Sequence, residues 1–222
     1  MLLYFDDEQG MARGLGRRAG LRVARIGRHR FPDGELKLTL PPRVPRRVAL
    51  LRSLHQPNEK LVELLLASRT ARELGARHLT LVAPYLAYMR QDAAFAPGEA
   101  VSQRHVGALL STLFDGVITV DPHLHRVASL AEVIPRTRCV ILSAAPLIGR
   151  FLGREAPDAL LLGPDVESTQ WVRQAARAAG LEWAVAEKVR HSDRRVTISL
   201  PPRPLRGRHV VLVDDLVSTG RT

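Results

Sequence analysis

The sequence predicts an α/β fold with a largely parallel sheet, and three observations support this. Short apolar runs alternate with helical patterns along the 222 residues, which is the order of elements in α/β proteins. Several runs are followed directly by acidic residues, as at Val213-Asp214-Asp215, and the carboxyl ends of strands are where open α/β sheets bind ligands. The rhythm of strand, helix and strand runs to about residue 135 and then starts again, which indicates two domains.

The expected strands are short runs rich in apolar and β-branched residues. In chain order they cover residues 2–5, 22–26, 36–40, 48–51, 79–83, 117–120, 140–142, 159–162, 183–186 and 210–213. The clearest helix begins near Asn58 and ends before Gly75, a residue suited to a helix C-cap. Its expected buried face carries four leucines, Leu61, Leu64, Leu65 and Leu74. Further helices are expected over residues 102–113, 144–152 and 168–179.

Composition indicates a globular protein and weighs against two classes. Hydrophobic residues make up 45% of the chain and charged residues 25%, and no apolar run approaches the ~20 residues that cross a bilayer. The 33 basic and 22 acidic residues give a net charge of +11, which would suit nucleic acid. The cations are scattered, however, and only 5% of residues are aromatic, so there are few platforms for base stacking. We therefore expect neither a membrane nor a nucleic-acid partner. The absence of a signal-peptide pattern indicates a cytoplasmic protein.

The C-terminal segment carries the most specific chemistry. Asp214 and Asp215 follow the last expected strand and can accept hydrogen bonds from sugar hydroxyls. The next polar residues are Ser218, Thr219, Gly220, Arg221 and Thr222. The backbone N–H groups of such a turn can surround a phosphate. These features predict a site for a ribose 5-phosphate group, although the same residue types also occur at ordinary strand-to-turn boundaries.

Two polar segments in the first half of the chain are candidates for ligand contacts. Residues 31–35, Phe-Pro-Asp-Gly-Glu, lie between expected strands, and a Pro-Asp-Gly turn is their simpler explanation. Arg90 and Gln91 also follow a strand. The guanidinium can pair with phosphate, and the amide offers both a donor and an acceptor. A solvated loop would explain these two residues equally well.

Further candidates follow the later strands. His123 and His125 point the same way if the chain is extended and can reach a metal, although magnesium prefers oxygen ligands and paired loop histidines are more often structural. Asp165 follows a strand in the second half. Lys188 and Arg190 lie beyond another strand, where two cations can stabilise charge developing on a phosphoryl group. A solvated charge run is the alternative for that pair.

Taken in order, these motifs resemble those of ribose-phosphate diphosphokinase, the phosphoribosyl-diphosphate (PRPP) synthetase family. The resemblance spans nearly the whole chain, and residues 90–102 are similar to the short form of archaeal-type members. It implies an α/β protein of two similar phosphoribosyltransferase-like domains, 1–138 and 139–222, the second incomplete because the chain stops after the PRPP-binding loop. It also implies transfer of the diphosphoryl group of ATP to the anomeric hydroxyl of ribose 5-phosphate, with Mg²⁺, to give PRPP and AMP.

The resemblance implies a role for each candidate residue. Phe31, Asp33 and Glu35 would bind the adenine of ATP in the site of a neighbouring subunit, which implies a homo-oligomer of at least two chains. The remaining roles are ATP binding by Arg90 and Gln91, metal binding by His123 and Asp165, catalysis by Lys188 and Arg190 from a mobile loop, and ribose 5-phosphate binding by Asp214, Asp215, Ser218, Thr219, Gly220, Arg221 and Thr222.

Two other interpretations remain open. A type I phosphoribosyltransferase would share the final loop, but it has no use for Lys188 and Arg190 at these positions. A non-catalytic PRPP-synthetase-like regulator would keep the fold and lose the chemistry. Glu167, which stands where many family members have a small residue, and the early stop favour the regulator. The retained cations and metal-ligand candidates oppose it.

Overall fold

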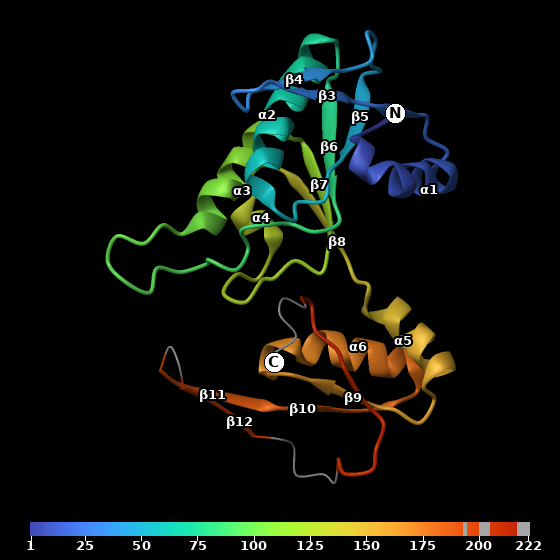
Figure 1. Ribbon diagram of the computed structural model, residues 1–222, viewed down its shortest axis with the longest axis vertical. Coiled ribbons are helices and arrows are strands. Elements are labelled where there is room, and N and C mark those ends of the chain that lie inside the picture. The colour runs from blue at the N-terminus through green and yellow to red at the C-terminus, as the bar shows by residue number, and fades with distance from the viewer. Residues whose placement is uncertain (193–194, 200–204, 217–222) are drawn as a thin grey trace. The chain divides into compact units, whose positions relative to one another are not determined.

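The computed structural model describes residues 1–192, 195–199 and 205–216 and divides into two compact units, Met1–Leu142 and Ser143–Thr222 (Figure 1). The expected boundary between residues 138 and 139 falls inside the last strand of unit 1. This strand, β8 (Arg138–Leu142), pairs with β7 (Gly116–Val120), and the pairing keeps those residues in the first unit.

Unit 1 is built on a six-stranded sheet in the order β2-β1-β5-β6-β7-β8. Every pairing in it is parallel, which confirms the predicted α/β class. The strand order reverses between β1 and β5, because β2 was added on one side and all later strands on the other; such a reversal marks the place where open sheets bind ligands. The strands that precede β7 are β1 (Leu2–Tyr4), β2 (Val23–Arg25), β5 (Arg47–Leu51) and β6 (His78–Ala83).

Helices cover both faces of this sheet (Figure 1). One face packs on α1 through a small apolar cluster that includes Leu2, Tyr4 and Ala12. The other face packs on α2, α3 and α4 through a larger core that includes Leu3 and Phe5. Alternation of side chains along β1 therefore supplies both cores. The helices are α1 (Gln9–Ala19), α2 (Pro57–Glu73), α3 (Ser102–Leu113) and α4 (Leu130–Val133).

The buried face of α2 matches the predicted one in part: Leu61, Leu64 and Leu74 pack in or against the core of unit 1. Leu64 is fully buried, but Leu65 is 39% exposed, so the expectation for Leu65 was wrong. The buried positions follow the helical repeat and include two charged residues: Lys60, Glu63, Leu64, Ala67, Ser68 and Ala71. Charged residues occupy core positions here because they have polar partners inside the unit. As predicted, Gly75 follows the helix with a positive φ, of 106°.

A β-hairpin separate from the main sheet follows β2. Its strands, β3 (Gly27–Arg30) and β4 (Leu36–Thr39), pair antiparallel. The predicted Pro-Asp-Gly turn joins them, with Gly34 at a φ of 94°, a conformation that glycine adopts without strain. The Phe31 N–H donates to the Glu35 carbonyl at 2.8 Å and closes the turn.

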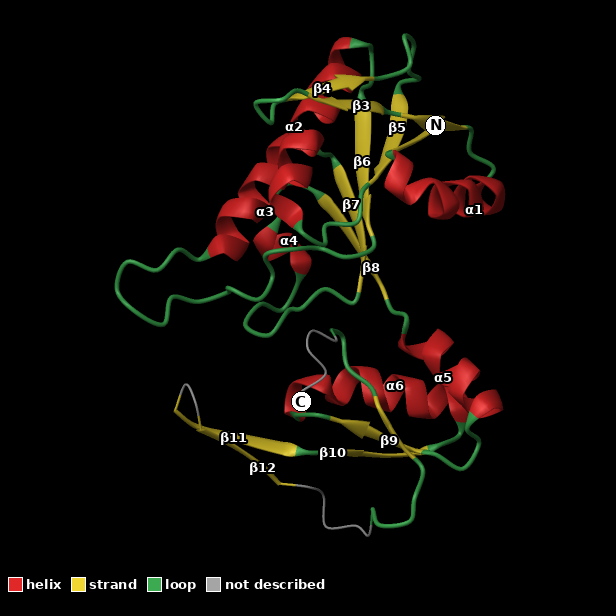
Figure 2. Ribbon diagram, in the orientation of Figure 1, coloured by secondary structure: helices red, strands yellow, loops and turns green. Residues whose placement is uncertain are grey.

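Unit 2 contains a parallel three-stranded sheet in the order β10-β9-β13, with α5 and α6 together on one side (Figure 2). Leu161, Trp171 and Val172 form the core between helices and sheet. The two helices approach so closely that a Cβ at Gly149 would lie 2.1 Å from the Ala175 carbonyl oxygen. The elements are α5 (Ala145–Glu155), β9 (Leu160–Gly163), α6 (Thr169–Ala179), β10 (Glu182–Val185) and β13 (Val210–Leu212).

A second hairpin, β11 (Glu187–Ser192) with β12 (Arg195–Ser199), follows β10 where a polar loop was expected. The β-branched run of Val196, Thr197 and Ile198 gives β12 strand propensity, and β11 pairs with it despite its charges. In the described part of the chain, no helix combines the length and the apolar character that a bilayer crossing requires.

Replacing Gly107 by alanine should destabilise unit 1. A Cβ at this position of α3 would lie 2.0 Å from the Val133 carbonyl oxygen, so α3 and α4 would have to move apart at a cost of about 1–3 kcal/mol. Gly14→Ala is the matched control, because a Cβ there meets nothing within 4 Å and should stabilise α1 by about 0.5–1 kcal/mol. Thermal unfolding of both variants checks this. A Gly107→Ala protein as stable as the wild type would contradict the close packing.

Candidate functional site

Two loops leave neighbouring strands at the carboxyl edge of the unit 1 sheet. The loop after β6 carries Arg90, Gln91 and Asp92, and the loop after β7 carries His123 and His125. Because β6 and β7 are adjacent and parallel, both loops begin at the same edge. Motifs that are about thirty residues apart in sequence therefore belong to one region of the unit.

An ion pair that the motifs did not indicate joins these two loops. Arg126 Nη1 donates to Asp92 Oδ1 at 2.6 Å, and the same guanidinium lies 5.4 Å from the ring centroid of Phe95. The Asp92 side chain is only 2% exposed, so its charge requires a partner. Arg126 thus fixes the loop after β6 against the loop after β7.

Arg90 and Gln91 differ in exposure on this fixed loop. Arg90 is exposed, whereas Gln91 is half-buried and its amide donates to the Ala93 carbonyl at 3.0 Å. An exposed guanidinium on a loop whose backbone is held by its neighbours suits a phosphate group, because little loop ordering remains to be done on binding.

The rings of His123 and His125 meet edge to face. Their centroids are 3.8 Å apart with an interplanar angle of 78°, and the two Nε2 atoms are in contact. This is the arrangement expected for positions i and i+2. Two neutral imidazoles so placed offer converging lone pairs to a cation, and a singly protonated pair can share the proton. Nitrogen ligands suit transition metals better than magnesium.

The tip of the β3–β4 hairpin presents the residues expected to bind adenine. Phe31 is 39% exposed, and its ring meets the edge of His29 at 4.8 Å between centroids. The Glu35 N–H donates to Asp33 Oδ1 at 3.1 Å, so the Asp33 carboxylate also supports the turn. A depression of about 460 Å³ lies between this turn and α2. An exposed aromatic ring beside hydrogen-bond acceptors suits a nucleobase.

Three carboxylates gather at the carboxyl edge of the unit 2 sheet. Asp165 follows β9, while Asp214 and Asp215 follow β13, and these strands are adjacent and parallel. Asp165 Oδ1 accepts the backbone N–H groups of Glu167 and Ser168 at 3.1 and 3.3 Å. Asp165 therefore also caps the short 3₁₀ helix η2 (Val166–Ser168). Asp214 Oδ1 accepts the N–H of Asp215 at 2.9 Å.

The carboxyl group of Asp214 has a raised pKa. Burial raises the pKa of Asp214 to about 6, and the negative charges of Asp215 and Asp165 also raise it, while the Asp215 N–H opposes the change. A carboxylate in such surroundings gains from a nearby cation or from hydroxyl donors. Oxygen-rich surroundings of this kind fit the ligand preference of magnesium and also suit the hydroxyls of a sugar.

The remaining candidates lie on the second hairpin and at the end of the chain. Lys188 and Arg190 are on β11, where their backbones pair with Ile198 and Val196. A strand thus stands where the resemblance implied a mobile loop. The expected phosphate-binding residues, Ser218, Thr219, Gly220, Arg221 and Thr222, lie outside the described residues.

Comparison with known proteins identifies the family. Residues 1–113 match the family model described as the N-terminal domain of ribose phosphate pyrophosphokinase. A ribose-phosphate pyrophosphokinase of Methanopyrus kandleri is 35% identical over 225 residues, which cover 100% of this chain and 76% of the relative. One from Halobacterium salinarum is 34% identical and is covered to 78%. The chain belongs to the ribose-phosphate pyrophosphokinase family. The resemblance drawn from its motifs is therefore confirmed, and so is the expectation of an enzyme.

The fold of this chain also has a match among solved structures. The phosphoribosylpyrophosphate synthetase of Mycobacterium smegmatis superposes with a TM-score of 0.81 at 22% identity, covering 100% of this chain and 72% of the other. The stretch that matches the family model includes the β3–β4 hairpin and the loop after β6. These are the two parts of unit 1 that carry its expected ATP-binding residues.

The sequence motifs did not point to three charged residues that organise these regions, Arg52, Glu63 and Arg126. Arg126 lies close to a recognised motif, but nothing separates it from surface cations in a chain so rich in arginine. Arg52 follows a strand directly, and Glu63 occupies a core position of α2. An acidic residue at the period of a buried helical face was the signal that could have found Glu63.

The charge of Asp215 should set part of the pKa of Asp214. Asp215→Asn should lower that pKa from about 6 toward its ordinary 3.8, though not fully, because burial is the larger cause. Carbon-13 NMR of the carboxyl groups measures it, with Asp158→Asn, which removes a well-exposed carboxylate elsewhere in unit 2, as control. An unchanged pKa would show that the charge of Asp215 does not reach Asp214.

The raised pKa of Asp214 also makes the stability of the fold depend on pH. Because the folded-state pKa of Asp214 is raised, its contribution to stability is fully present below the unfolded value. It is lost as pH rises through about 6. We therefore expect a weaker loss of stability between about pH 4 and 6 in Asp215→Asn than in the wild type.

Proposed function

We propose that this chain transfers the diphosphoryl group of ATP to the anomeric hydroxyl of ribose 5-phosphate and so forms PRPP and AMP. The observation that carries the proposal is the alignment of the whole chain with proteins named ribose-phosphate pyrophosphokinase at 34–35% identity. The polar residues at the carboxyl edges of both sheets support it, since these edges are where open α/β sheets place their ligands.

ATP is the proposed ligand of unit 1. Arg90 is exposed for the phosphates, and Gln91 lies beside it on the loop that Arg126 holds. Phe31, with Asp33 and Glu35 at the hairpin tip, is proposed to receive the adenine. A stacking surface and a cation on separate elements are what a nucleotide with a base and a polyphosphate requires.

Ribose 5-phosphate is the proposed ligand of unit 2. Asp214 and Asp215 offer acceptors for the ribose hydroxyls, and a hydroxyl donor would relieve the crowding of charge around Asp214. The residues proposed for the 5-phosphate are the turn 218–222. Asp165 in unit 2 and His123 in unit 1 are the proposed magnesium ligands; when bound, the metal would neutralise charge on the polyphosphate.

In the proposed reaction the β-phosphorus of ATP, which carries the γ-phosphoryl group with it, is transferred from the α–β bridging oxygen to the anomeric oxygen of ribose 5-phosphate. The anomeric hydroxyl oxygen bonds to the β-phosphorus of ATP and loses its proton, the bond from this phosphorus to the α–β bridging oxygen breaks, and AMP leaves with that electron pair. Charge therefore grows on the transferred group and on the leaving oxygen. Lys188 and Arg190 are the proposed catalytic cations that stabilise it.

A direct assay tests the proposal. AMP should form from ATP only when ribose 5-phosphate is present, and PRPP should appear in equal amount. Displacement of pyrophosphate from PRPP by a free base, giving a nucleoside monophosphate and free pyrophosphate, would instead indicate a phosphoribosyltransferase. Absence of both reactions in a folded, ligand-binding protein would favour the non-catalytic regulator.

Lys188→Ala should lower kcat far more than it weakens binding of either substrate. A cation that meets charge formed only in the transition state contributes little to the ground state, and loss of one such contact typically costs about 10²–10³ in kcat. Steady-state kinetics measure the change, and Arg17→Ala, which removes an exposed cation of α1, is the control. Near-normal turnover would make Lys188 an ordinary surface charge.

The chain is also proposed to be a homo-oligomer in which the hairpin of one subunit completes the ATP site of another. If so, Glu35→Ala and Lys188→Ala each disable a different contribution to the shared site. Mixing the two inactive variants should restore part of the activity through hybrid sites. No recovery, with subunit exchange demonstrated by mass labelling, would place the hairpin in its own subunit's site or outside any site.

A further inference from the structure

The β3–β4 hairpin has little apolar packing to fix its orientation. It forms a two-stranded sheet of its own, and isolated hairpins of this kind are marginally stable at best. None of residues 27–39 is buried, and Leu36 and Leu38 are the side chains that reach half-burial. Leu38 of β4 packs against the main core of unit 1, and polar contacts supply the remaining constraint on the direction of the tip.

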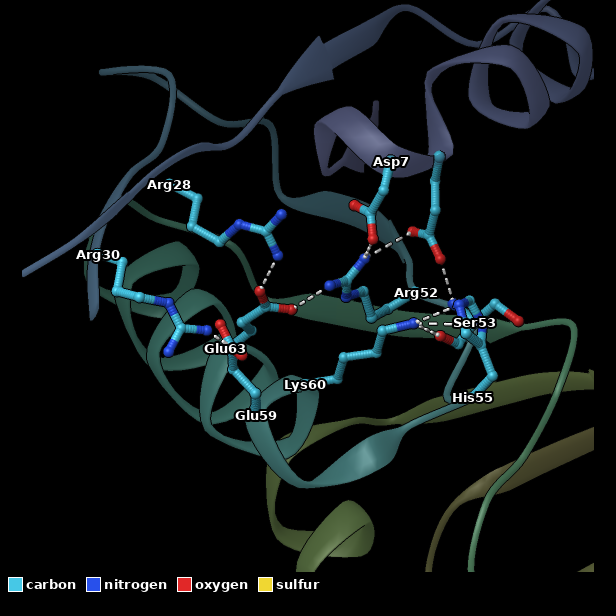
Figure 3. A network of polar contacts seen from close by, with 10 residues as sticks. Asp7, Arg28, Arg30, Arg52, Ser53, His55, Glu59, Lys60 and Glu63 are labelled. Carbon is cyan, nitrogen blue, oxygen red and sulfur yellow. Dashed lines mark hydrogen bonds and ion pairs between the residues drawn. The ribbon is translucent and has the colours of Figure 1, made fainter. Parts of the chain in front are cut away.

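Two ion pairs connect the hairpin to α2 (Figure 3). Arg30 pairs with Glu59, and Arg28 Nη1 donates to Glu63 Oε1 at 2.5 Å. Residues two apart on a strand lie on one side about 6.7 Å apart, and residues four apart on a helix are about 6 Å apart along its axis. The two rows of charges thus match in spacing, so the pairs form a ladder between β3 and the first turns of α2.

The inner step of this ladder is anchored in the core. The Glu63 side chain has no exposed surface, and its Oε2 lies 2.5 Å from Nη2 of Arg52, which is 1% exposed. Arg52 also donates to Asp7 Oδ2 at 2.7 Å and lies 4.6 Å from the ring centroid of Phe5. One buried carboxylate therefore joins the hairpin, α2 and the segment after β5 (Figure 3).

We propose that Arg28 and Glu63 are a positioning pair that fixes the hairpin tip for nucleotide binding. The inference rests on the proposed function, because it takes the tip as part of an ATP site. The turn begins at Phe31, three residues beyond Arg28, so release of this pair lets the whole tip tilt. Misplacement of a binding element by about 1 Å can cost as much as a hundredfold in rate.

Loss of a positioning pair should change the kinetic constants differently from loss of an ion pair that only stabilises the fold. Loss of the pair should raise KM for ATP and leave KM for ribose 5-phosphate unchanged, because Asp214 and Asp215 belong to the other unit. A purely structural role would lower the unfolding temperature and the amount of active enzyme without separating the two KM values.

Arg28→Met is the variant of choice. It keeps an unbranched apolar side chain, removes the guanidinium that lies 6.0 Å from the Phe5 ring centroid, and leaves buried Glu63 paired with Arg52. Arg25→Met is the matched control, since Arg25 is a nearby arginine whose pair with Asp6, at 3.2 Å, is exposed on both sides. Should Arg28→Met fail to fold, Arg30→Met breaks the exposed outer step and should give a smaller effect of the same kind.

Two measurements separate this inference from the proposed function. Hydrogen exchange of amides 27–39 should be faster in Arg28→Met and unchanged in Arg25→Met. KM for ATP should rise roughly tenfold in Arg28→Met, the scale of one charge-assisted hydrogen bond, and should stay at the wild-type value in Arg25→Met.

If hydrogen exchange of amides 27–39 is as slow in Arg28→Met as in the wild type, the positioning role is overturned, whatever the activity of the variant. Faster exchange with an unchanged KM for ATP in an active enzyme would also overturn it, because the tip would then be free to move without consequence for the nucleotide. A wild-type protein that forms no AMP would overturn the proposed function instead. In that case the tip's affinity for ATP, measured by equilibrium binding to both variants, decides the inference.

Discussion

The buried contact between Arg52 and Glu63 is the constraint on which the arrangement of unit 1 depends. It joins the segment after β5 to α2, and Arg52 also meets Asp7 of the segment after β1, at the strands between which the order reverses. A charge that is 1% exposed must be paired, and removal of one partner of such a pair typically costs about 3–5 kcal/mol. The pair therefore determines how α2 sits on the sheet, and through Arg28 it reaches a hairpin that the sheet itself does not hold.

Arg52 lies beside two neighbouring carboxyl groups, Asp7 and Glu8, whose pKa values are shifted in opposite directions. Burial alone would raise the pKa of Asp7, but its hydrogen bond to Arg52 and the charge of Arg52 outweigh burial and lower it. Burial raises the pKa of Glu8 despite the Ser53 N–H and Arg52, which is 3.8 Å away. Asp7 thus remains a charged partner whose contribution is lost only as pH falls. Glu8 mainly fixes the backbone of Ser53 at the start of the loop after β5.

Local pattern predicted the strands that are compact apolar runs, and with them the carboxyl-edge positions of the candidate residues, but it missed the charged strands β3 and β11 and the partner β12. It missed α1, whose Gly10, Gly14 and Gly16 lower helix propensity. Gly16 is required there, since a Cβ would lie 2.4 Å from Val23 Cγ1. It misplaced the edge of the buried face of α2, because Leu65 looks buried and Glu63 looks exposed until the partner Arg52 is known. Contacts between distant segments have no local pattern, so the links made by Arg126 and Arg28 required the structure.

These links also give a physical reason for part of the arginine content of the chain. Arg28, Arg30, Arg52 and Arg126 each tie a loop or hairpin to a carboxylate on another segment. At Arg52 one planar guanidinium meets Asp7, Glu63 and the face of Phe5; the single ammonium of a lysine cannot occupy three directions in this way. Arginines that are paired with carboxylates of the same chain contribute to the count of basic residues behind the formal charge of +11, but their charge is partly neutralised by those partners. The positive balance is therefore compatible with an enzyme that binds small phosphorylated substrates, and it requires no nucleic-acid partner.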